Sequence, residues 1–295
     1  MLELKWNKAE ESYNDFCSRV ILNFKEYGFE NKGEVLTKLT GVDMLDNSRK
    51  VAYGLKNIQK AFISGYGEQF ADVEIKNEIV GNKVLAIGDI HTPFEHKDYL
   101  SFFKRIYKKY NCNAVVFIGD ILDSHYSSYH ESSPDGFGGE DELLKAKKSI
   151  ADFHKTFPNA FVCLGNHDLI PNRKAFSGGL SSRWIKSMEE VLETPTWKYS
   201  DHFIIDGIKY VHGTGRKARQ RCQQDMISTV QGHYHSESYI ENYVGSDGTR
   251  RFAMQIGCGI DVDEYAFSYG KHFAKPHLNC GVVIDGKLPI IEFME

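Results

Sequence analysis

The chain has 295 residues, of which 41% are hydrophobic, and a formal net charge of -4. This is the composition of a globular protein with an ordinary core. The negative net charge excludes a protein that binds nucleic acid through bulk positive charge. Any contact with nucleic acid therefore needs a local basic patch or bound cations. The six cysteines form no C-x-x-C pair, which argues against a structural zinc site and favours buried thiols in a reducing compartment.

Residues 1–77 differ in pattern from the rest of the chain. The N-terminus lacks the apolar core of a signal peptide, and no apolar run is long enough to span a bilayer, so we expect a cytoplasmic protein without a membrane partner. Helical spacing of apolar residues predicts short helices over 7–29, 32–39 and 48–63, which form a helical N-terminal domain or cap. A helix-turn-helix DNA-binding unit over 34–40 and 47–60 is an alternative, which the local balance of acidic and basic residues does not favour.

After residue 77 the pattern alternates between strands, loops and helices. Apolar runs predict strands over 83–90, 113–119 and 160–165, and helical spacing predicts helices over 99–110 and 143–156. An Asp-Gly turn between 203–205 and 209–212 predicts a hairpin. Further strands are expected over 229–233, 252–257 and 281–284. Alternation followed by hairpins predicts an α/β domain over 78–295, with two mixed sheets stacked between helices.

Metal-ligand side chains follow the predicted strands, at the point where each strand ends. Strand ends are where sites form in α/β sheets, and carboxylate, amide and imidazole groups without a thiolate suit Mn²⁺, Fe²⁺ or Zn²⁺. A single such segment is more often structural, but a whole ordered series predicts a metal site. The segments are Gly88-Asp89-Ile90-His91, Gly119-Asp120-Ile121-Leu122-Asp123, Gly165-Asn166-His167-Asp168, Val211-His212-Gly213 and Gly232-His233-Tyr234-His235.

This ordered series, from about residue 83 to 235, resembles the calcineurin-like metallophosphoesterase superfamily. The resemblance implies a four-layer α/β/β/α fold and a centre of two divalent metal ions, with Mn²⁺ preferred and Fe²⁺, Zn²⁺ or Ni²⁺ as alternatives. The ligands that it implies are Asp89, His91 and His235 for the first metal, Asn166, His212 and His233 for the second, and Asp120 as a bridge between them.

The same resemblance implies roles for three further residues. His167 is expected to protonate the leaving oxygen of the substrate rather than to bind metal. Asp168 is expected to orient His167 through a ring nitrogen. Asp123 is expected to support its loop rather than bind an ion.

The type of phosphoester is less well defined. Ser/Thr protein phosphatases carry an arginine where this chain has Ser124, and the Gly-His-x-His block is closer to the nuclease and phosphodiesterase branches. We therefore expect a phosphodiesterase acting on DNA, RNA or a nucleotide. A phosphomonoesterase acting on a protein, a nucleotide or a nucleic-acid end is the alternative. A DNA-binding protein working through its N-terminal segment is a weaker one, because its metal ligands would be idle. Whether the chain forms a homodimer is left open.

Two segments are candidates for substrate binding. A basic cluster follows His212 and is suited to a phosphate backbone, although such runs are usually solvated helix faces. The long loop over 123–139 carries tyrosines that either stack on a base or pack the loop down. The candidate residues are Arg216, Lys217, Arg219, Arg221, Tyr126 and Tyr129.

Overall fold

The computed structural model describes residues 25–29, 83–129, 135–261, 263–264 and 275–295. The chain divides into two compact units, Met1–Gln69 and Phe70–Glu295. Within 25–29, the amide of Gly28 donates to the carbonyl of Lys25 at 3.1 Å and closes a turn at the end of the first predicted helix. The other predicted N-terminal helices, including the helix-turn-helix alternative, lie outside the described residues. The predicted boundary at residues 77 and 78 stays a prediction.

Two mixed sheets make up the described part of the second unit. Four parallel strands form one side of the first sheet, namely β1 (Lys83–Ile87), β2 (Ala114–Phe117), β3 (Phe161–Cys163) and β4 (Lys198–Ser200). The antiparallel strands β10 (Asn279–Ile284) and β11 (Leu288–Phe293) complete it, in the order β11-β10-β1-β2-β3-β4. The second sheet has the order β5-β6-β7-β9-β8, with β5 (His202–Ile205), β6 (Ile208–Val211), β7 (Ser228–Gln231), β8 (Tyr239–Val244) and β9 (Arg250–Gln255).

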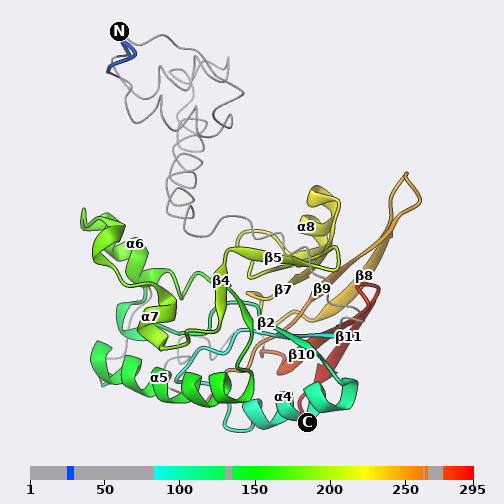
Figure 1. Ribbon diagram of the computed structural model, residues 1–295, viewed down its shortest axis with the longest axis horizontal. Coiled ribbons are helices and arrows are strands. Elements are labelled where there is room, and N and C mark those ends of the chain that lie inside the picture. Colours follow the sequence, from blue (N-terminus) through cyan, green and yellow to red (C-terminus); the bar gives the residue numbers. More distant parts are fainter. Residues whose placement is uncertain (1–24, 30–82, 130–134, 262, 265–274) are drawn as a thin grey trace. The chain divides into compact units, whose positions relative to one another are not determined.

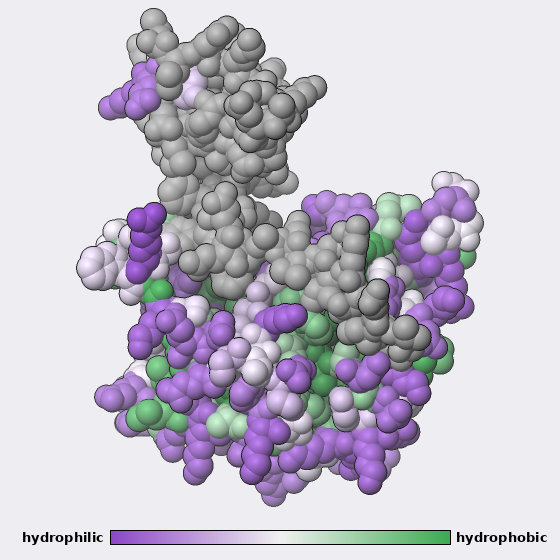
Figure 2. Space-filling view, viewed as in Figure 1, coloured by the Kyte–Doolittle hydropathy of each residue, from purple (hydrophilic) through white to green (hydrophobic). Residues whose placement is uncertain are grey.

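Helices cover the outer face of each sheet, as Figure 1 shows from α4 and α5 at the bottom to α8 at the top. The helices α4 (Tyr99–Tyr110) and α5 (Gly139–Thr156) pack on the first sheet, and α8 (Ala218–Asp225) packs on β7 and β9 of the second. Hydrophilic side chains cover most of the outer face of α4 and α5, along the lower edge of Figure 2. Among the described residues, no helix has the length and apolar content needed to cross a membrane.

The apolar core is divided by the sheets into layers. Phe103 of α4 and Phe153 of α5 join Phe117 in the cluster between the helices and the first sheet. A second cluster, which includes Val116, fills the space between the sheets. Neighbouring residues of a strand point to opposite faces, so Val116 and Phe117 enter different clusters. The predicted four-layer α/β/β/α fold is confirmed.

The strands stop earlier than their apolar runs predict. β1 ends at Ile87 rather than at residue 90, and β2 ends at Phe117 rather than at residue 119. Beyond the ends of β1, β2 and β7, His91, Asp120 and His233 have positive φ angles of 55°, 45° and 73°. A residue in this left-handed region cannot continue an extended strand, and such conformations persist only where the surrounding structure holds them. The strands therefore end where the backbone turns to direct polar side chains toward one place.

Candidate metal centre

The predicted ligands meet at one edge of the two stacked sheets. β1, β2 and β3 run parallel in the first sheet, as do β6 and β7 in the second, so their following loops converge. His212, after β6, approaches the carbonyl oxygen of Ile118, after β2, through Nδ1 at 3.1 Å. This contact joins the two sheets beside the site and leaves the Nε2 atom of His212 free to face the other predicted ligands.

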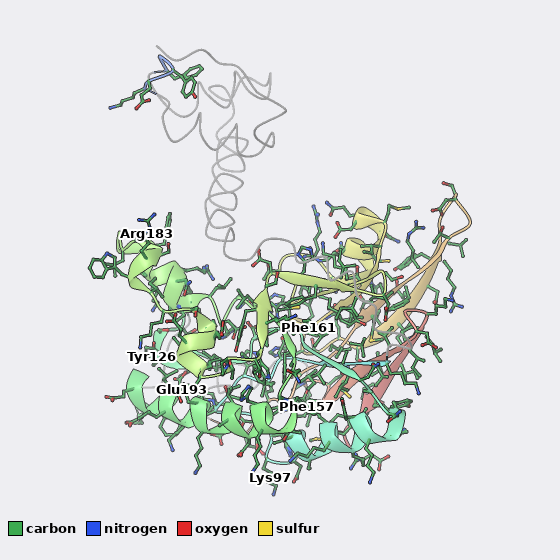
Figure 3. All side chains as sticks on the ribbon, viewed as in Figure 1. Lys97, Tyr126, Phe157, Phe161, Arg183 and Glu193 are labelled. Carbon is green, nitrogen blue, oxygen red and sulfur yellow. The ribbon has the colours of Figure 1, made fainter. Side chains whose placement is uncertain are left out.

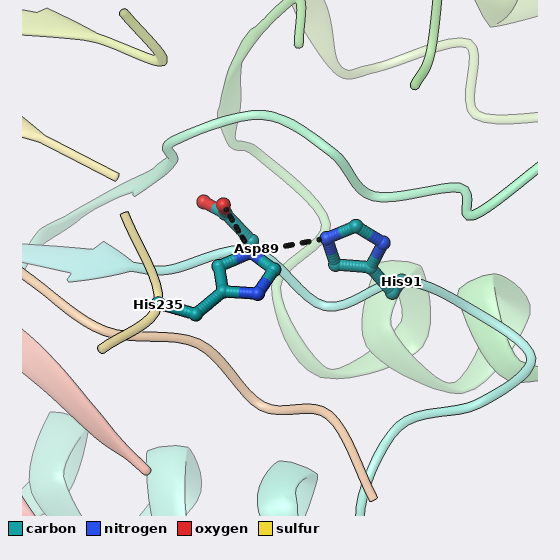
Figure 4. A group of neighbouring side chains, drawn as sticks. All are labelled: Asp89, His91 and His235. Atoms are coloured by element: carbon teal, nitrogen blue, oxygen red, sulfur yellow. Dashed lines mark hydrogen bonds and ion pairs between the residues drawn. The ribbon is translucent and has the colours of Figure 1, made fainter. Parts of the chain in front are cut away.

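Asp89, His91 and His235 form a first group of converging ligand atoms (Figure 4). The Nε2 atom of His235 lies 3.0 Å from Oδ2 of Asp89 and 3.3 Å from Nε2 of His91. Two ring nitrogens and a carboxylate oxygen therefore point into one small space. Both nitrogens can offer lone pairs there only if a cation lies between them, which is the donor set of a borderline metal ion.

A second group lies around Nε2 of His212. This nitrogen is 3.2 Å from Oδ2 of Asp120, 3.2 Å from Nδ1 of His233 and 3.0 Å from Oδ1 of Asn166. One imidazole nitrogen carries at most one proton and cannot satisfy three partners. Carboxylate, amide and imidazole donors thus converge on a point that suits a second cation.

Asp120 lies between the two groups. Its Oδ2 atom is 3.2 Å from Nε2 of His212 and 3.8 Å from Nε2 of His91, one residue from each group. Its Oδ1 atom instead accepts the backbone amide of His167 at 2.8 Å. That hydrogen bond fixes the carboxylate with its other oxygen directed between the groups, which is the placement a bridging ligand needs.

The charges of the site also fit bound cations. Oδ1 of Asp89 is buried without a hydrogen-bond donor in the part of the chain that the structure describes. Burial raises the pKa of Asp120, but the charges of His212 and His167 outweigh it and hold that pKa well below its usual range. For His212, burial lowers the pKa, and Asp120 and Asp89 outweigh it, raising the pKa to about 9. Buried carboxylates that stay ionised need positive charge beside them, which the histidines supply when protonated and divalent metals would supply when the histidines act as ligands.

Asp123 has a larger role than its predicted support of the loop. Its Oδ1 atom lies 2.6 Å from Nδ1 of His91, and its backbone carbonyl lies 2.6 Å from Nδ1 of His167. Through these contacts Asp123 orients both rings, whose centroids are 4.7 Å apart. A carboxylate behind a ligand histidine fixes its tautomer and directs Nε2 toward the metal. Burial lowers the pKa of His167, but Asp120 and Asp123 outweigh it, so that pKa is raised.

The predicted role of Asp168 is wrong. Nδ1 of His167 contacts the carbonyl of Asp123 instead, and the two carboxylate oxygens of Asp168 accept backbone amides, from Leu122 at 3.0 Å and from Gly165 at 2.8 Å. Asp168 is fully buried and joins the loops after β2 and β3. The pKa of Asp168 is raised to about 7 by burial and by the nearby charge of Asp120. It therefore supports the backbone that presents the ligands.

Glycines let these loops approach one another. A Cβ atom added at Gly165 would lie 2.1 Å from Oδ1 of Asp120, and one at Gly232 would lie 2.2 Å from Oδ1 of Asp89. Both separations are far below van der Waals contact. The Gly residues beside Asn166 and His233 in the sequence motifs are thus sterically required by the carboxylates that they face.

The predicted basic cluster is mostly engaged within the chain itself. Lys217 forms an ion pair with Glu237, and Arg219 pairs with Glu241 at 2.9 Å. Arg221 donates to the side chain of Gln231 at 3.1 Å. The guanidinium of Arg219 also lies 4.4 Å from the ring centroid of Tyr239. These contacts hold α8 against the second sheet, whereas the alternative expected from the sequence was a solvated helix face.

Arg216 and the two tyrosines remain accessible. Arg216 is exposed, and Tyr126 and Tyr129 are 46% and 57% exposed. The guanidinium of Arg173 lies 4.8 Å from the centroid of the Tyr129 ring.

Cys258 was not predicted as a site residue. Its backbone forms a β-bridge with Asp89. Burial lowers the pKa of His235, but Cys258 is among the groups that outweigh this effect and raise that pKa. A buried thiol gives no sequence signal for this position.

The two stacked sheets and the converging groups of ligand atoms agree with the class of metallophosphoesterases. Residues 82–262 match the calcineurin-like phosphoesterase family, and the chain belongs to that family. Members of this family typically bind divalent metals, in agreement with the converging groups. A comparison with curated proteins found no match.

Solved structures show similarity at low identity. Vacuolar protein sorting 29 from Cryptosporidium parvum is 14% identical, with a TM-score of 0.37 over 73% of this chain and 98% of that one. A metallophosphoesterase from Sphaerobacter thermophilus is 12% identical, with a TM-score of 0.38 over 73% and 88%. The Pseudomonas putida nuclease MPE is 11% identical, with a TM-score of 0.30 over 70% and 86%.

Proposed function

We propose that this protein is a phosphodiesterase that hydrolyses nucleic acid or a nucleotide with two divalent metal ions, preferably Mn²⁺. The observation that supports this most is the position of Asp120 between two groups of ligand atoms. Asp89, His91 and His235 would hold one ion, and Asn166, His212 and His233 the other. When bound, such a pair of ions lowers the pKa of a water molecule and neutralises charge on the phosphate.

His167 is the proposed general acid. Its Nδ1 atom donates to the carbonyl of Asp123 at 2.6 Å, so the ring is held in a fixed orientation with Nε2 directed elsewhere. His167 is partly exposed, whereas the neighbouring Asp168 is fully buried. A partly exposed imidazole beside the metal ligands is placed to give a proton to the leaving oxygen.

The diester substrate class rests on the motifs rather than on the metal geometry. Ser124, at the position where Ser/Thr protein phosphatases have arginine, is buried in the loop after β2. The loop therefore presents no guanidinium at that position to clamp a terminal phosphate, which favours a diester over a phosphoprotein. A phosphomonoesterase remains the competing proposal.

The test compares hydrolysis of bis-p-nitrophenyl phosphate and p-nitrophenyl phosphate with Mn²⁺ present. We expect diester preference, and loss of activity in Asp120→Asn but not in the matched variant Asp152→Asn, which alters an exposed carboxylate on α5. Rates of hydrolysis of DNA, RNA and cyclic dinucleotides are then compared to identify the natural substrate. Monoester preference that depends on Asp120 would replace the phosphodiesterase proposal with a phosphatase. Activity that survives Asp120→Asn would remove the proposed metal centre as its source.

A further inference from the structure

A segment directly after the loop that carries His167 has a charge opposite to that of the whole chain. Residues 170–186, here called the basic arm, contain Arg173, Lys174, Arg183 and Lys186 and no acidic residue, although the chain has a net charge of -4. The arm comprises α6 (Ile170–Ser177), the connection over 178–181, η3 (Ser182–Trp184) and the two residues that follow. It is thus a local basic patch of the kind that an acidic protein needs to contact a polyanion.

The cations of the arm are exposed and carry exposed apolar groups between them. Arg173, Lys174, Arg183 and Lys186 are all exposed, and none of them forms an ion pair with another described residue. Trp184 is 83% exposed and Leu180 56% exposed. Figure 3 places Arg183 at the end of the arm that lies away from the sheets. A large aromatic ring exposed beside a second exposed apolar residue and several exposed cations has the character of a binding surface.

The arm follows the loop after β3, which carries His167, and lies beside the loop after β2. Pro171, Asn172, Ile185 and Lys186 of the arm line a cavity of about 200 Å³ together with Leu122, Ser124 and Tyr126. Leu122 and Ser124 flank Asp123, whose carbonyl orients His167. The candidate Tyr129 also contacts the arm, because Arg173 and Lys174 lie 4.8 and 5.5 Å from its ring centroid. The arm therefore begins beside the two loops that carry Asp123 and His167.

We propose that the basic arm binds a single strand of nucleic acid and leads it to the metal centre, with Trp184 stacking on a base. The inference rests on the proposed phosphodiesterase function. Surfaces that bind single strands combine cations along the phosphate backbone with aromatic rings on which bases stack, and the arm has both. Arg183 and Lys186 flank Trp184, so the phosphates on either side of a stacked base would each meet a cation.

Binding to the full-length protein is measured by fluorescence anisotropy with a labelled single-stranded oligonucleotide, in EDTA to prevent cleavage. Trp184→Ala should weaken binding about 5- to 100-fold, and Trp184→Phe should restore much of it, because a ring can still stack. An abasic strand should bind equally to the protein and to Trp184→Ala. Arg183→Ala with Lys186→Ala should weaken binding to both strands and reduce the slope of log Kd against log salt by about 1.4.

A matched control is Lys104→Ala with Lys108→Ala, which removes two exposed cations from α4. This variant should bind like the unaltered protein. Equal Kd values for the arm variants and the control would overturn the proposal. So would a Trp184→Ala effect of the same size on the abasic strand. Binding of anionic lipid vesicles without oligonucleotide binding would identify a lipid surface instead.

Activity separates this inference from the proposed function. The ratio of kcat/KM for an oligonucleotide to that for bis-p-nitrophenyl phosphate should fall at least about tenfold in the arm variants and stay constant in the α4 control. If both substrates are hydrolysed and the ratio stays constant, the proposed role of the basic arm is wrong, and the proposed phosphodiesterase function is retained. If neither diester is hydrolysed, the proposed function fails, and the anisotropy measurement still decides whether the arm binds nucleic acid.

Discussion

The carboxylate of Asp123 lies 2.6 Å from the Nδ1 atom of His91, and both side chains are buried. The contact fixes which nitrogen of His91 carries the proton, so that Nε2 is left to face His235 and Asp120. Because the backbone carbonyl of Asp123 orients His167, one residue links a proposed metal ligand with the proposed general acid.

Replacing Asp123 should weaken metal binding without displacing His167. Asp123→Ala removes the carboxylate behind His91 but keeps the carbonyl that accepts from His167. We expect about 10- to 100-fold lower affinity for Mn²⁺, measured by isothermal titration calorimetry. Asp152→Ala on the exposed face of α5 is the control. An affinity equal to that of the control would show that the Asp123 carboxylate does not support a ligand.

Removing the imidazole of His167 should slow turnover while metal stays bound. His167→Ala is expected to lower kcat by about 10²- to 10⁴-fold for a diester with an alkyl leaving group. The loss should be smaller for p-nitrophenolate, which needs less protonation. Steady-state rates with both leaving groups, at saturating Mn²⁺, check this. A loss of the same size for both would contradict the role of general acid.

Asp168 should matter mainly for stability. Asp168→Ala leaves the buried amides of Leu122 and Gly165 without their acceptor, at about 1–3 kcal/mol for each. We therefore expect a clearly lower free energy of unfolding, measured by urea denaturation in EDTA. A variant with full stability and reduced kcat would instead support the discarded pairing with His167.

Gly165 should tolerate no side chain. In Gly165→Ala the new methyl group would overlap Oδ1 of Asp120, whereas at Gly138 a Cβ atom meets nothing within 4 Å. We expect Gly165→Ala to lose metal binding and activity, because Asp120 must move. Gly138→Ala should retain both. Metal titration of the two variants side by side gives the comparison, and normal binding by Gly165→Ala would show that Asp120 need not keep this position.

Glu142 should make stability depend on pH. Its side chain is 3% exposed, and burial raises the pKa of its carboxyl from 4.5 to about 7. Between these values the folded chain binds the proton and the unfolded chain does not, so this contribution to stability is present below pH 4.5 and falls as pH rises to 7. Between pH 5 and pH 8, the protein should lose up to about 3 kcal/mol of unfolding free energy relative to Glu142→Gln. Urea unfolding of both proteins in EDTA at the two pH values measures this loss. A constant difference would show that Glu142 titrates normally.

The elements that sequence predicted best are those whose apolar pattern decides their structure. α4 occupies the predicted range, because Phe102, Phe103 and Ile106 recur at helical spacing and are all buried. β8 was not predicted. Its residues are partly buried or exposed at the edge of the second sheet, and none is fully buried, so no apolar run marks it. Only three residues form β4, which is too few for a pattern.

At the site, the types of the ligand residues could be predicted from the sequence, but not all of their hydrogen-bond partners. The spacing of Asp89 and His91 after an apolar run predicts a ligand pair at a strand end, and the structure brings them together with the other predicted ligands. The partner of Asp168 was mispredicted because adjacency to His167 in sequence does not show which way a side chain points. The basic arm was overlooked because its charges are spread over α6, η3 and the residues after η3, and only the absence of acidic residues unites them.

Each group of ligand atoms takes members from both sheets. Asp89 and Asp120 follow strands of the first sheet, and His212, His233 and His235 follow strands of the second. A shift of one sheet across the other would therefore pull both groups apart at once. Metal ions bound between these residues would cross-link the two sheets. The alignment of the sheets and the affinity for metal would therefore depend on each other.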